Sequence, residues 1–115
     1  MDQEQETTLH IAEIPYESGS IRFRYSRYLS PDGSRLIRHG LFIAYRESGQ
    51  VATEVYYEHG QEHGLCRAYH ENGRLAAEGR YNNGAEEGEW RFWGPDGSLE
   101  STTYYVDGVE QRPPI

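Results

Sequence analysis

Short extended runs, in which apolar and polar positions alternate, fill most of the chain, and turn-forming residues separate them. One example begins with residues 65–70, turns at Asn72-Gly73 and returns through residues 74–81. Asp96-Gly97 supplies the same turn signal one unit later, and Ser48-Gly49 is a weaker equivalent one unit earlier. Successive runs of this kind predict β-hairpins.

The connections between these hairpins carry a different signal. Residues 58–64 and residues 82–88 are longer polar segments, and each contains two glycines. We therefore expect longer connections at these places, which join three hairpins into an all-β, antiparallel meander.

Glycine and aromatic positions recur every 24 residues from Gly40 onward, which marks the chain as a repeat protein. The matched positions in the three copies are Gly40, Tyr45, Gly49, Tyr57 and Gly60; Gly64, Tyr69, Gly73, Tyr81 and Gly84; and Gly88, Trp93, Gly97, Tyr105 and Gly108. We assign repeats to residues 40–63, 64–87 and 88–111, with no insertion between them.

The remaining sequence is assigned around these repeats. Residues 21–39 are a divergent, truncated copy that caps the array. Residues 1–12 form a flexible N-terminal segment, and residues 13–115 form one β domain.

The repeats also indicate which side chains share a face of the sheet. The returning strands place small residues and a tyrosine on one face, whereas Glu54, Tyr56, Glu78, Arg80 and Tyr104 fall on the other, as a solvated or a contact surface. On the first strands, rings and arginines share one side, opposite Phe42, Cys66 and Trp90: Tyr45, Arg67, Tyr69, Arg91 and Trp93. These residue types are enriched in binding hot spots, but the same rings are equally consistent with a packed layer of a thin sheet.

Composition narrows the class of partner. The chain has 115 residues, with 19 acidic and 11 basic residues and a net charge of −8, which argues against nucleic acid or an anionic membrane as the main partner. The charge is divided, because residues 21–39 contain five arginines and one aspartate. The polar N-terminus lacks a signal-peptide pattern, and the single cysteine predicts a reducing, cytoplasmic compartment.

Candidate chemistry is sparse. His59 and His63 are four positions apart, but they fall in a turn, where the spacing does not make metal ligands converge. Cys66 lies in mid-strand, where a small hydrophobe is expected, rather than as a nucleophile paired with His70. No phosphate-binding, hydrolase or metalloprotease motif occurs. We therefore expect no enzyme activity, no cofactor and no metal site.

The spacing G-x4-Y-x3-G-x7-Y-x2-G resembles the variant MORN repeat, closely over residues 40–111 and loosely over residues 21–39. The resemblance implies a single elongated, curved antiparallel sheet. In short bacterial proteins, similar repeats occur in toxin–antitoxin antitoxins and in immunity proteins. Longer eukaryotic proteins with such repeats are linked to phospholipid binding, which the acidic character of residues 40–111 disfavours here.

The resulting hypothesis is an immunity or antitoxin protein that neutralises a cognate toxin by direct binding. Acidic turn residues would suit a basic surface of that toxin: Glu58, Glu62, Glu86, Glu87 and Glu89. The alternative is a non-catalytic adaptor that organises several proteins. The strand near Tyr104 is a candidate free edge, which would allow a homodimer or toxin binding by strand pairing.

Overall fold

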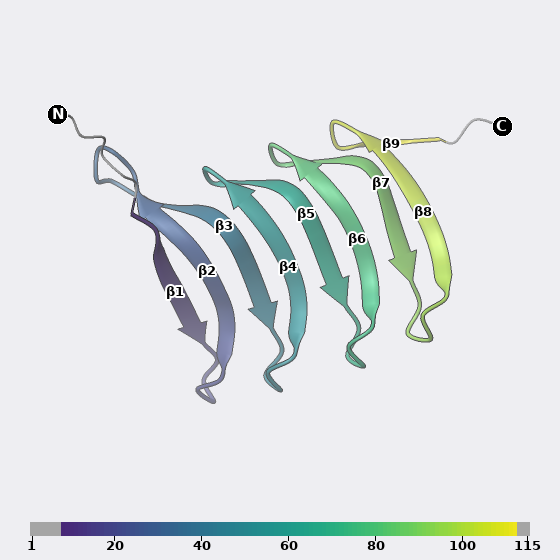
Figure 1. Ribbon diagram of the computed structural model, residues 1–115, viewed down its shortest axis with the longest axis horizontal. Coiled ribbons are helices and arrows are strands. Elements are labelled where there is room, and N and C mark those ends of the chain that lie inside the picture. The colour runs from purple at the N-terminus through teal and green to yellow at the C-terminus, as the bar shows by residue number, and fades with distance from the viewer. Residues whose placement is uncertain (1–7, 113–115) are drawn as a thin grey trace.

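A computed structural model describes residues 8–112, which form one antiparallel sheet in which every strand pairs with its neighbours in the sequence (Figure 1). The nine strands are β1 (His10–Pro15), β2 (Ile21–Leu29), β3 (Leu36–Tyr45), β4 (Val51–Glu58), β5 (Gln61–Tyr69), β6 (Leu75–Asn82), β7 (Ala85–Trp93), β8 (Leu99–Val106) and β9 (Val109–Gln111). The sheet measures 58 × 40 × 22 Å, and the predicted all-β meander is confirmed. Within this part of the chain no helix is long and apolar enough to span a membrane.

The hairpins use two kinds of turn. In the first kind, a glycine with positive φ donates its N–H to the carbonyl three residues earlier, as Gly73 does to His70. This kind closes every turn at one end of the sheet and, through Gly33 and Ser30, the turn between β2 and β3 at the other end. At the other end, β4 joins β5 through His59 and Gly60 alone, both with positive φ (47° and 92°). The longer connections expected at residues 58–64 and 82–88 are therefore wrong. Two consecutive residues with positive φ make a tight hairpin turn, and the strand resumes at once.

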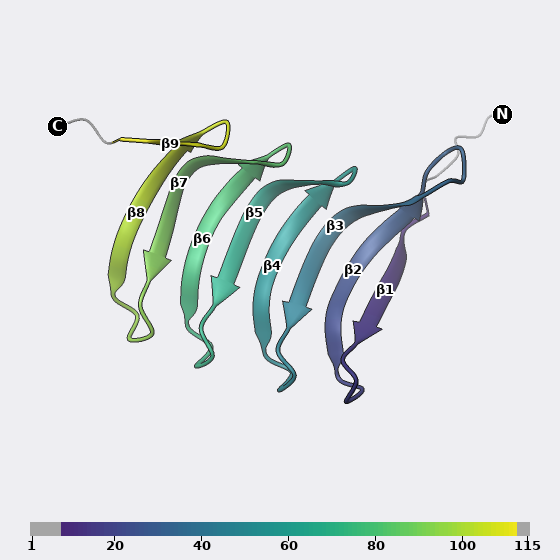
Figure 2. The ribbon, with the colours of Figure 1, turned by 180° about the vertical axis from the view of Figure 1, so that it is seen from behind.

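The second glycine of each expected connection lies inside a strand instead. Tyr57 lies opposite Glu62 and Val55 lies opposite Cys66, so β5 carries two more residues than β4 across the same interval, which includes Gly64. Gly64 has a φ of 99°, which suits glycine because it has no Cβ. Such irregularities bend a strand, and the strands are visibly curved in Figures 1 and 2.

A single sheet provides only a thin core. Residues that lie opposite one another across the strands project to the same face, which carries Tyr25, Phe42, Val55, Cys66, Trp90 and Thr103 and which we call the aromatic face. Gly79, opposite Cys66, leaves room on this face for the indole of Trp90, which is only 7% exposed. Tyr81 and Tyr105 contact this indole at ring-centroid distances of 5.2 and 6.3 Å.

The edges of the sheet differ from the prediction. The strand that contains Tyr104 is not an edge, because Tyr104 lies opposite Gln111 of β9, and the edges are β1 and β9. Strand β1 begins at His10, within the segment expected to be flexible, and the first part of that segment lies outside the described residues. The pairing of β1 with β2 buries Ala12, which alternation alone did not reveal.

Candidate functional site

The face opposite the aromatic face carries a row of alternating charges across four neighbouring strands. Glu54 of β4 lies opposite Arg67 of β5, Arg67 lies opposite Glu78 of β6, and Glu78 lies opposite Arg91 of β7. We call Glu54, Arg67, Glu78 and Arg91 the charged row. Opposite charges directly across strands stabilise a sheet, so the row is compatible with the fold while it presents polar groups on the surface.

Hydrogen bonds fix the side chains of the charged row. The Nε of Arg67 donates to Oε2 of Glu78 at 2.7 Å, and the Tyr69 hydroxyl donates to Oε1 of Glu54 at 2.7 Å. The Nε of Arg91 donates to Oε1 of Glu89 at 2.6 Å. These groups are therefore held ready for a partner, which lowers the entropy lost on binding.

The same contacts shift the pKa values of the row and its neighbours. The hydrogen bond to Glu78 raises the pKa of Arg67, and the hydrogen bond to Glu54 raises the pKa of the Tyr69 hydroxyl. The hydrogen bond to Glu89, at 3.1 Å, raises the pKa of Tyr104. All three groups stay protonated at neutral pH, so they offer hydrogen-bond donors and no general base.

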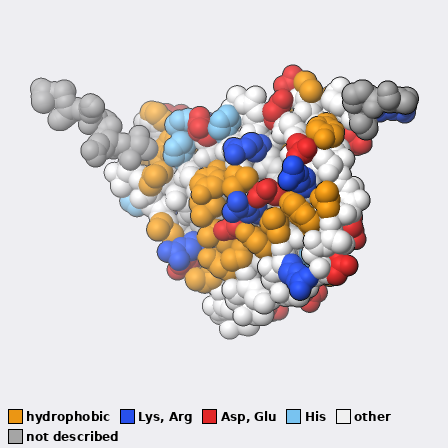
Figure 3. All heavy atoms as spheres, turned by 45° about the vertical axis from the view of Figure 1, so that its right-hand side comes forward, with side chains coloured by type: hydrophobic (Ala, Val, Ile, Leu, Met, Phe, Trp, Pro, Cys, Tyr) orange, Lys and Arg blue, Asp and Glu red, His pale blue; other side chains and the backbone are white. Residues whose placement is uncertain are grey.

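A groove of about 670 Å³ runs beside the row between β5, β6 and β7. Its lining includes Leu65, Arg67, Glu78, Arg80, Glu89 and Arg91. Figure 3 shows hydrophobic side chains gathered on one side of the molecule, with arginines and acidic residues interspersed among them. Mixed surfaces of aromatic, apolar and arginine side chains are typical of protein–protein interfaces.

The predicted aromatic and arginine residues fall on this surface to different degrees. Arg67 and Arg91 belong to the charged row, and Tyr69 bonds to it. Tyr45 and Trp93 are half-buried, and hydrogen bonds to their carbonyls brace neighbouring turns: the Tyr16 hydroxyl contacts Tyr45 at 2.7 Å, and Nε2 of His70 contacts Trp93 at 2.7 Å. The rings are thus neither a closed core nor a fully exposed patch, because a one-layer sheet has no second layer to cover them.

The five predicted acidic residues do not form one surface. Glu62 and Glu86 lie opposite Tyr57 and Tyr81, on the aromatic face. Glu89 lies beside the charged row and bonds to Arg91, whereas Glu58 is exposed at a turn. Glu87 accepts a hydrogen bond from the N–H of Asp107 at 3.1 Å, which is a structural role. The sequence does not reveal that Arg67 and Arg91 lie opposite these strands' glutamates, Glu54 and Glu78, because the pairing follows from the strand register.

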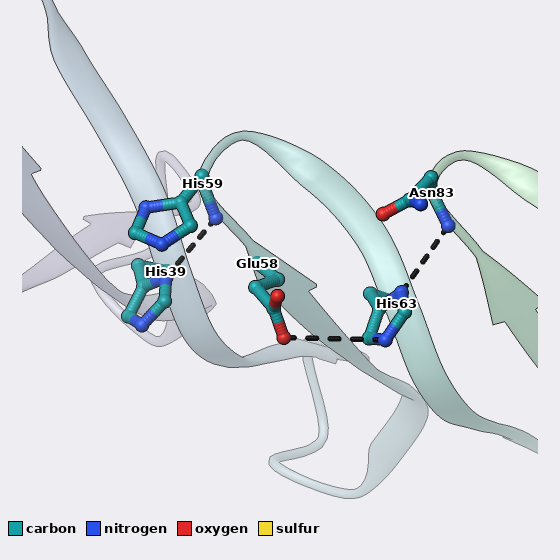
Figure 4. Close-up of polar contacts among 5 residues, drawn as sticks. All are labelled: His39, Glu58, His59, His63 and Asn83. Atoms are coloured by element: carbon teal, nitrogen blue, oxygen red, sulfur yellow. Dashed lines mark hydrogen bonds and ion pairs between the residues drawn. The ribbon is translucent and has the colours of Figure 1, made fainter.

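Two histidines hold neighbouring hairpins together (Figure 4). Of the pair expected in one turn, only His59 lies there, because the turn is so tight that His63 is already inside β5. His39 accepts a hydrogen bond at Nδ1 from the His59 N–H at 3.0 Å, and His63 accepts one at Nδ1 from the Asn83 N–H at 3.2 Å. Each donor lies at the first residue of a tight turn with positive φ. Among residues 8–112 no three His, Cys, Asp or Glu side chains converge as metal ligands, and these rings serve as acceptors for turns.

Cys66 lies on the aromatic face, between Val55 and Gly79 on the neighbouring strands. Burial raises the pKa of its thiol to about 11, so the thiolate is scarce at neutral pH. The side chain is therefore suited to packing and unsuited to nucleophilic chemistry.

The repeats of this sheet match a known family. The model of the MORN repeat variant matches residues 38–59, 62–83 and 86–107, so the chain belongs to the family of MORN repeat variant proteins. The three matches follow one another, and each covers most of a bent strand, a turn and the whole returning strand. No curated protein matches the chain.

Proposed function

We propose that this repeat scaffold is an immunity or antitoxin protein, which neutralises a cognate bacterial toxin by direct binding and catalyses no reaction. The charged row is the observation that supports the proposal most directly. It crosses four strands of an uncovered sheet face, with its arginines held by hydrogen bonds at 2.6 to 2.7 Å. Arginine and tyrosine groups held in this way supply contact area and directed donors at low entropic cost.

The toxin surface that fits this face carries both charges. Exposed Glu89 and half-buried Glu54 and Glu78 offer carboxylates to basic side chains, while Arg67 and Arg91 offer donors to acidic or carbonyl groups. The acidic turn residues alone predict a toxin with a basic cleft, whereas the charged row fits a toxin surface that carries both charges. The proposed site of action is the cytoplasm, in keeping with the single cysteine.

Co-expression with each protein encoded beside this chain tests the proposal, with survival of the host cells as the measurement. We expect rescue from one toxic neighbour, and a one-to-one complex of the two purified proteins. Arg91→Glu places a third carboxylate beside Glu78 and Glu89, and we expect it to abolish rescue. Arg22→Glu, the same charge change on β2 and outside the row, is the control and should preserve rescue.

Each other outcome contradicts part of the proposal. Equal rescue by both folded variants would mean that the charged row is not the binding surface. If no neighbour is toxic, or none is rescued, toxin neutralisation is wrong.

If toxin neutralisation is wrong, we propose instead that the chain is a non-catalytic adaptor. The two unpaired edges, β1 and β9, favour it, because they allow strand pairing with a second chain. Light scattering that shows self-association, or binding of several partners, would support it.

A further inference from the structure

Three arginines of the N-terminal third gather in a second groove, on the aromatic face and away from the charged row. This groove has a volume of about 570 Å³ and is bordered by β2, β3 and the turn between β4 and β5. Its lining includes Tyr25, Arg27, Arg35, Arg38 and His59, and no acidic residue. A basic groove is unexpected in a protein whose net charge is −8.

Arg27 and Arg38 lie directly opposite each other on β2 and β3. The corresponding pairs in the later repeats are Tyr57 with Glu62 and Tyr81 with Glu86. Like charges directly across strands destabilise a sheet. The first unit therefore carries an unfavourable pair where the later units carry neutral–acidic pairs, which an anion between the two guanidinium groups would relieve.

The guanidinium groups of this pair differ from those of the charged row in their partners. The Nε of Arg27 is shielded from solvent and has no hydrogen-bond partner, whereas Nε of Arg67 and of Arg91 each donate to a glutamate. Over the described range, no carboxylate forms an ion pair with Arg27 or Arg38. The Arg38 guanidinium is instead held over three rings, with its Cζ at 5.1, 5.0 and 5.6 Å from the centroids of Tyr25, Phe42 and Tyr57.

From this geometry we infer that the groove binds the carboxylates of an acidic peptide segment of a partner protein. Guanidinium groups form paired, planar hydrogen bonds with carboxylates, and two other arginines of this sheet, Arg67 and Arg91, each bind a glutamate through Nε. A volume of about 570 Å³, open along one side, exceeds that of a single ion and accommodates several residues of an extended chain. This surface is separate from the proposed toxin-binding face and does not depend on it.

Fluorescence anisotropy tests the inference, with the full-length protein and a labelled short peptide that contains several glutamates. The matched probe is the same peptide with glutamine in their place. We expect saturable binding of the glutamate peptide, which added salt weakens, and no comparable binding of the glutamine peptide. Arg38→Gln should weaken binding about tenfold, because it removes the donor that the rings hold in place.

Arg22→Gln is the matched control. Arg22 is also exposed and also lies over two rings, with its Cζ at 5.5 Å from Tyr16 and 4.9 Å from Phe23, but it lies outside the groove. The Arg22→Gln variant should bind the peptide as tightly as the unmodified protein does. A second control, Asp2→Asn with Glu4→Gln and Glu6→Gln, removes acidic groups of the chain that could compete, and it should bind at least as tightly.

Three results would overturn the inference. In the first, Arg22→Gln weakens binding as much as Arg38→Gln, which indicates attraction by net charge alone. In the second, the glutamine peptide binds as well as the glutamate peptide. In the third, inorganic phosphate binds to the groove and the glutamate peptide does not. Circular dichroism of each variant establishes that the sheet is intact, and Arg27→Gln provides a second test if Arg38→Gln fails to fold.

Discussion

Substitution of Gly79 by alanine is the sharpest test of how this one-layer sheet is stabilised. A Cβ at this position would overlap the indole of Trp90 and lie within 2.5 Å of its Cγ. The backbone of Gly79 does not have a positive φ, so the substitution introduces no conformational strain of its own. The expected effect is therefore displacement of the ring.

The expected loss of stability follows from the buried surface and the hydrogen bond that the displaced indole of Trp90 would lose. A tryptophan buries about 200 Å² of surface, and exposure of half of it at about 25 cal/mol/Å² costs about 2.5 kcal/mol. Its Nε1 also donates to the Arg80 carbonyl at 3.1 Å, a bond that contributes about 1 kcal/mol. We expect a loss of about 3.5 kcal/mol, which for a domain of this size lowers the melting temperature by about 14 °C.

Thermal unfolding followed by circular dichroism measures this change, and tryptophan fluorescence reports exposure of the ring. Gly73→Ala is the control for adding a Cβ, because nothing lies within 4 Å of that position, although its φ of 88° adds strain. We expect it to cost about 1 kcal/mol. Trp90→Phe provides a partner for a double-mutant cycle, in which the smaller ring should reduce the cost of Gly79→Ala. An unchanged melting temperature for Gly79→Ala, or additive effects of the two substitutions, would show that the indole of Trp90 does not depend on the space beside Gly79.

Three other predictions concern single groups. Hydrogen bonds, first from the Ser30 hydroxyl and then from Ser34, lower the pKa of Asp32 to about 2. Because the pKa is lower in the folded than in the unfolded state, Asp32 should stabilise the fold above about pH 4 and lose this effect as the pH falls toward 2. Asp32→Asn should therefore lower the melting temperature at pH 7 and not at pH 2. Cys66, with its pKa raised to about 11, should react with iodoacetamide at pH 8 much more slowly in the folded protein than in urea, and equal rates would show that the thiol is not protected. Glu87→Ala should cost about 1 kcal/mol in urea unfolding, because the N–H of Asp107 loses its acceptor, whereas Glu87→Gln should retain most of the stability; equal losses would contradict this role.

Much of the fold could be read from the sequence, because its repeat is regular. The spacing of Gly40, Gly64 and Gly88 defines the unit, and the alternation within each run defines the faces. The strand order confirms the meander, and the register adds that Val55 and Cys66, on different strands, share a face. Local signals suffice here because each hairpin contacts only its neighbours.

The turns were predicted less well. Asn72-Gly73 is a recognised turn pair, but His59-Gly60 was interpreted as part of a longer connection. The positive φ of His59 is stabilised from outside the hairpin, by His39 of the preceding strand. This hydrogen bond joins residues 20 positions apart, so a window of local sequence does not reveal it.

The amino-acid pattern is enough to define the repeat, the sheet and the residue types that each strand offers. Which of those residues meet depends on how the strands pair in the folded chain. Glu54 and Arg67 are 13 positions apart in the sequence, and they become neighbours through strand register. Arg27 and Arg38 become an opposed pair in the same way. Register depends on backbone hydrogen bonds and bulges along whole strands, and it is this collective pairing that turns separate side chains into a surface.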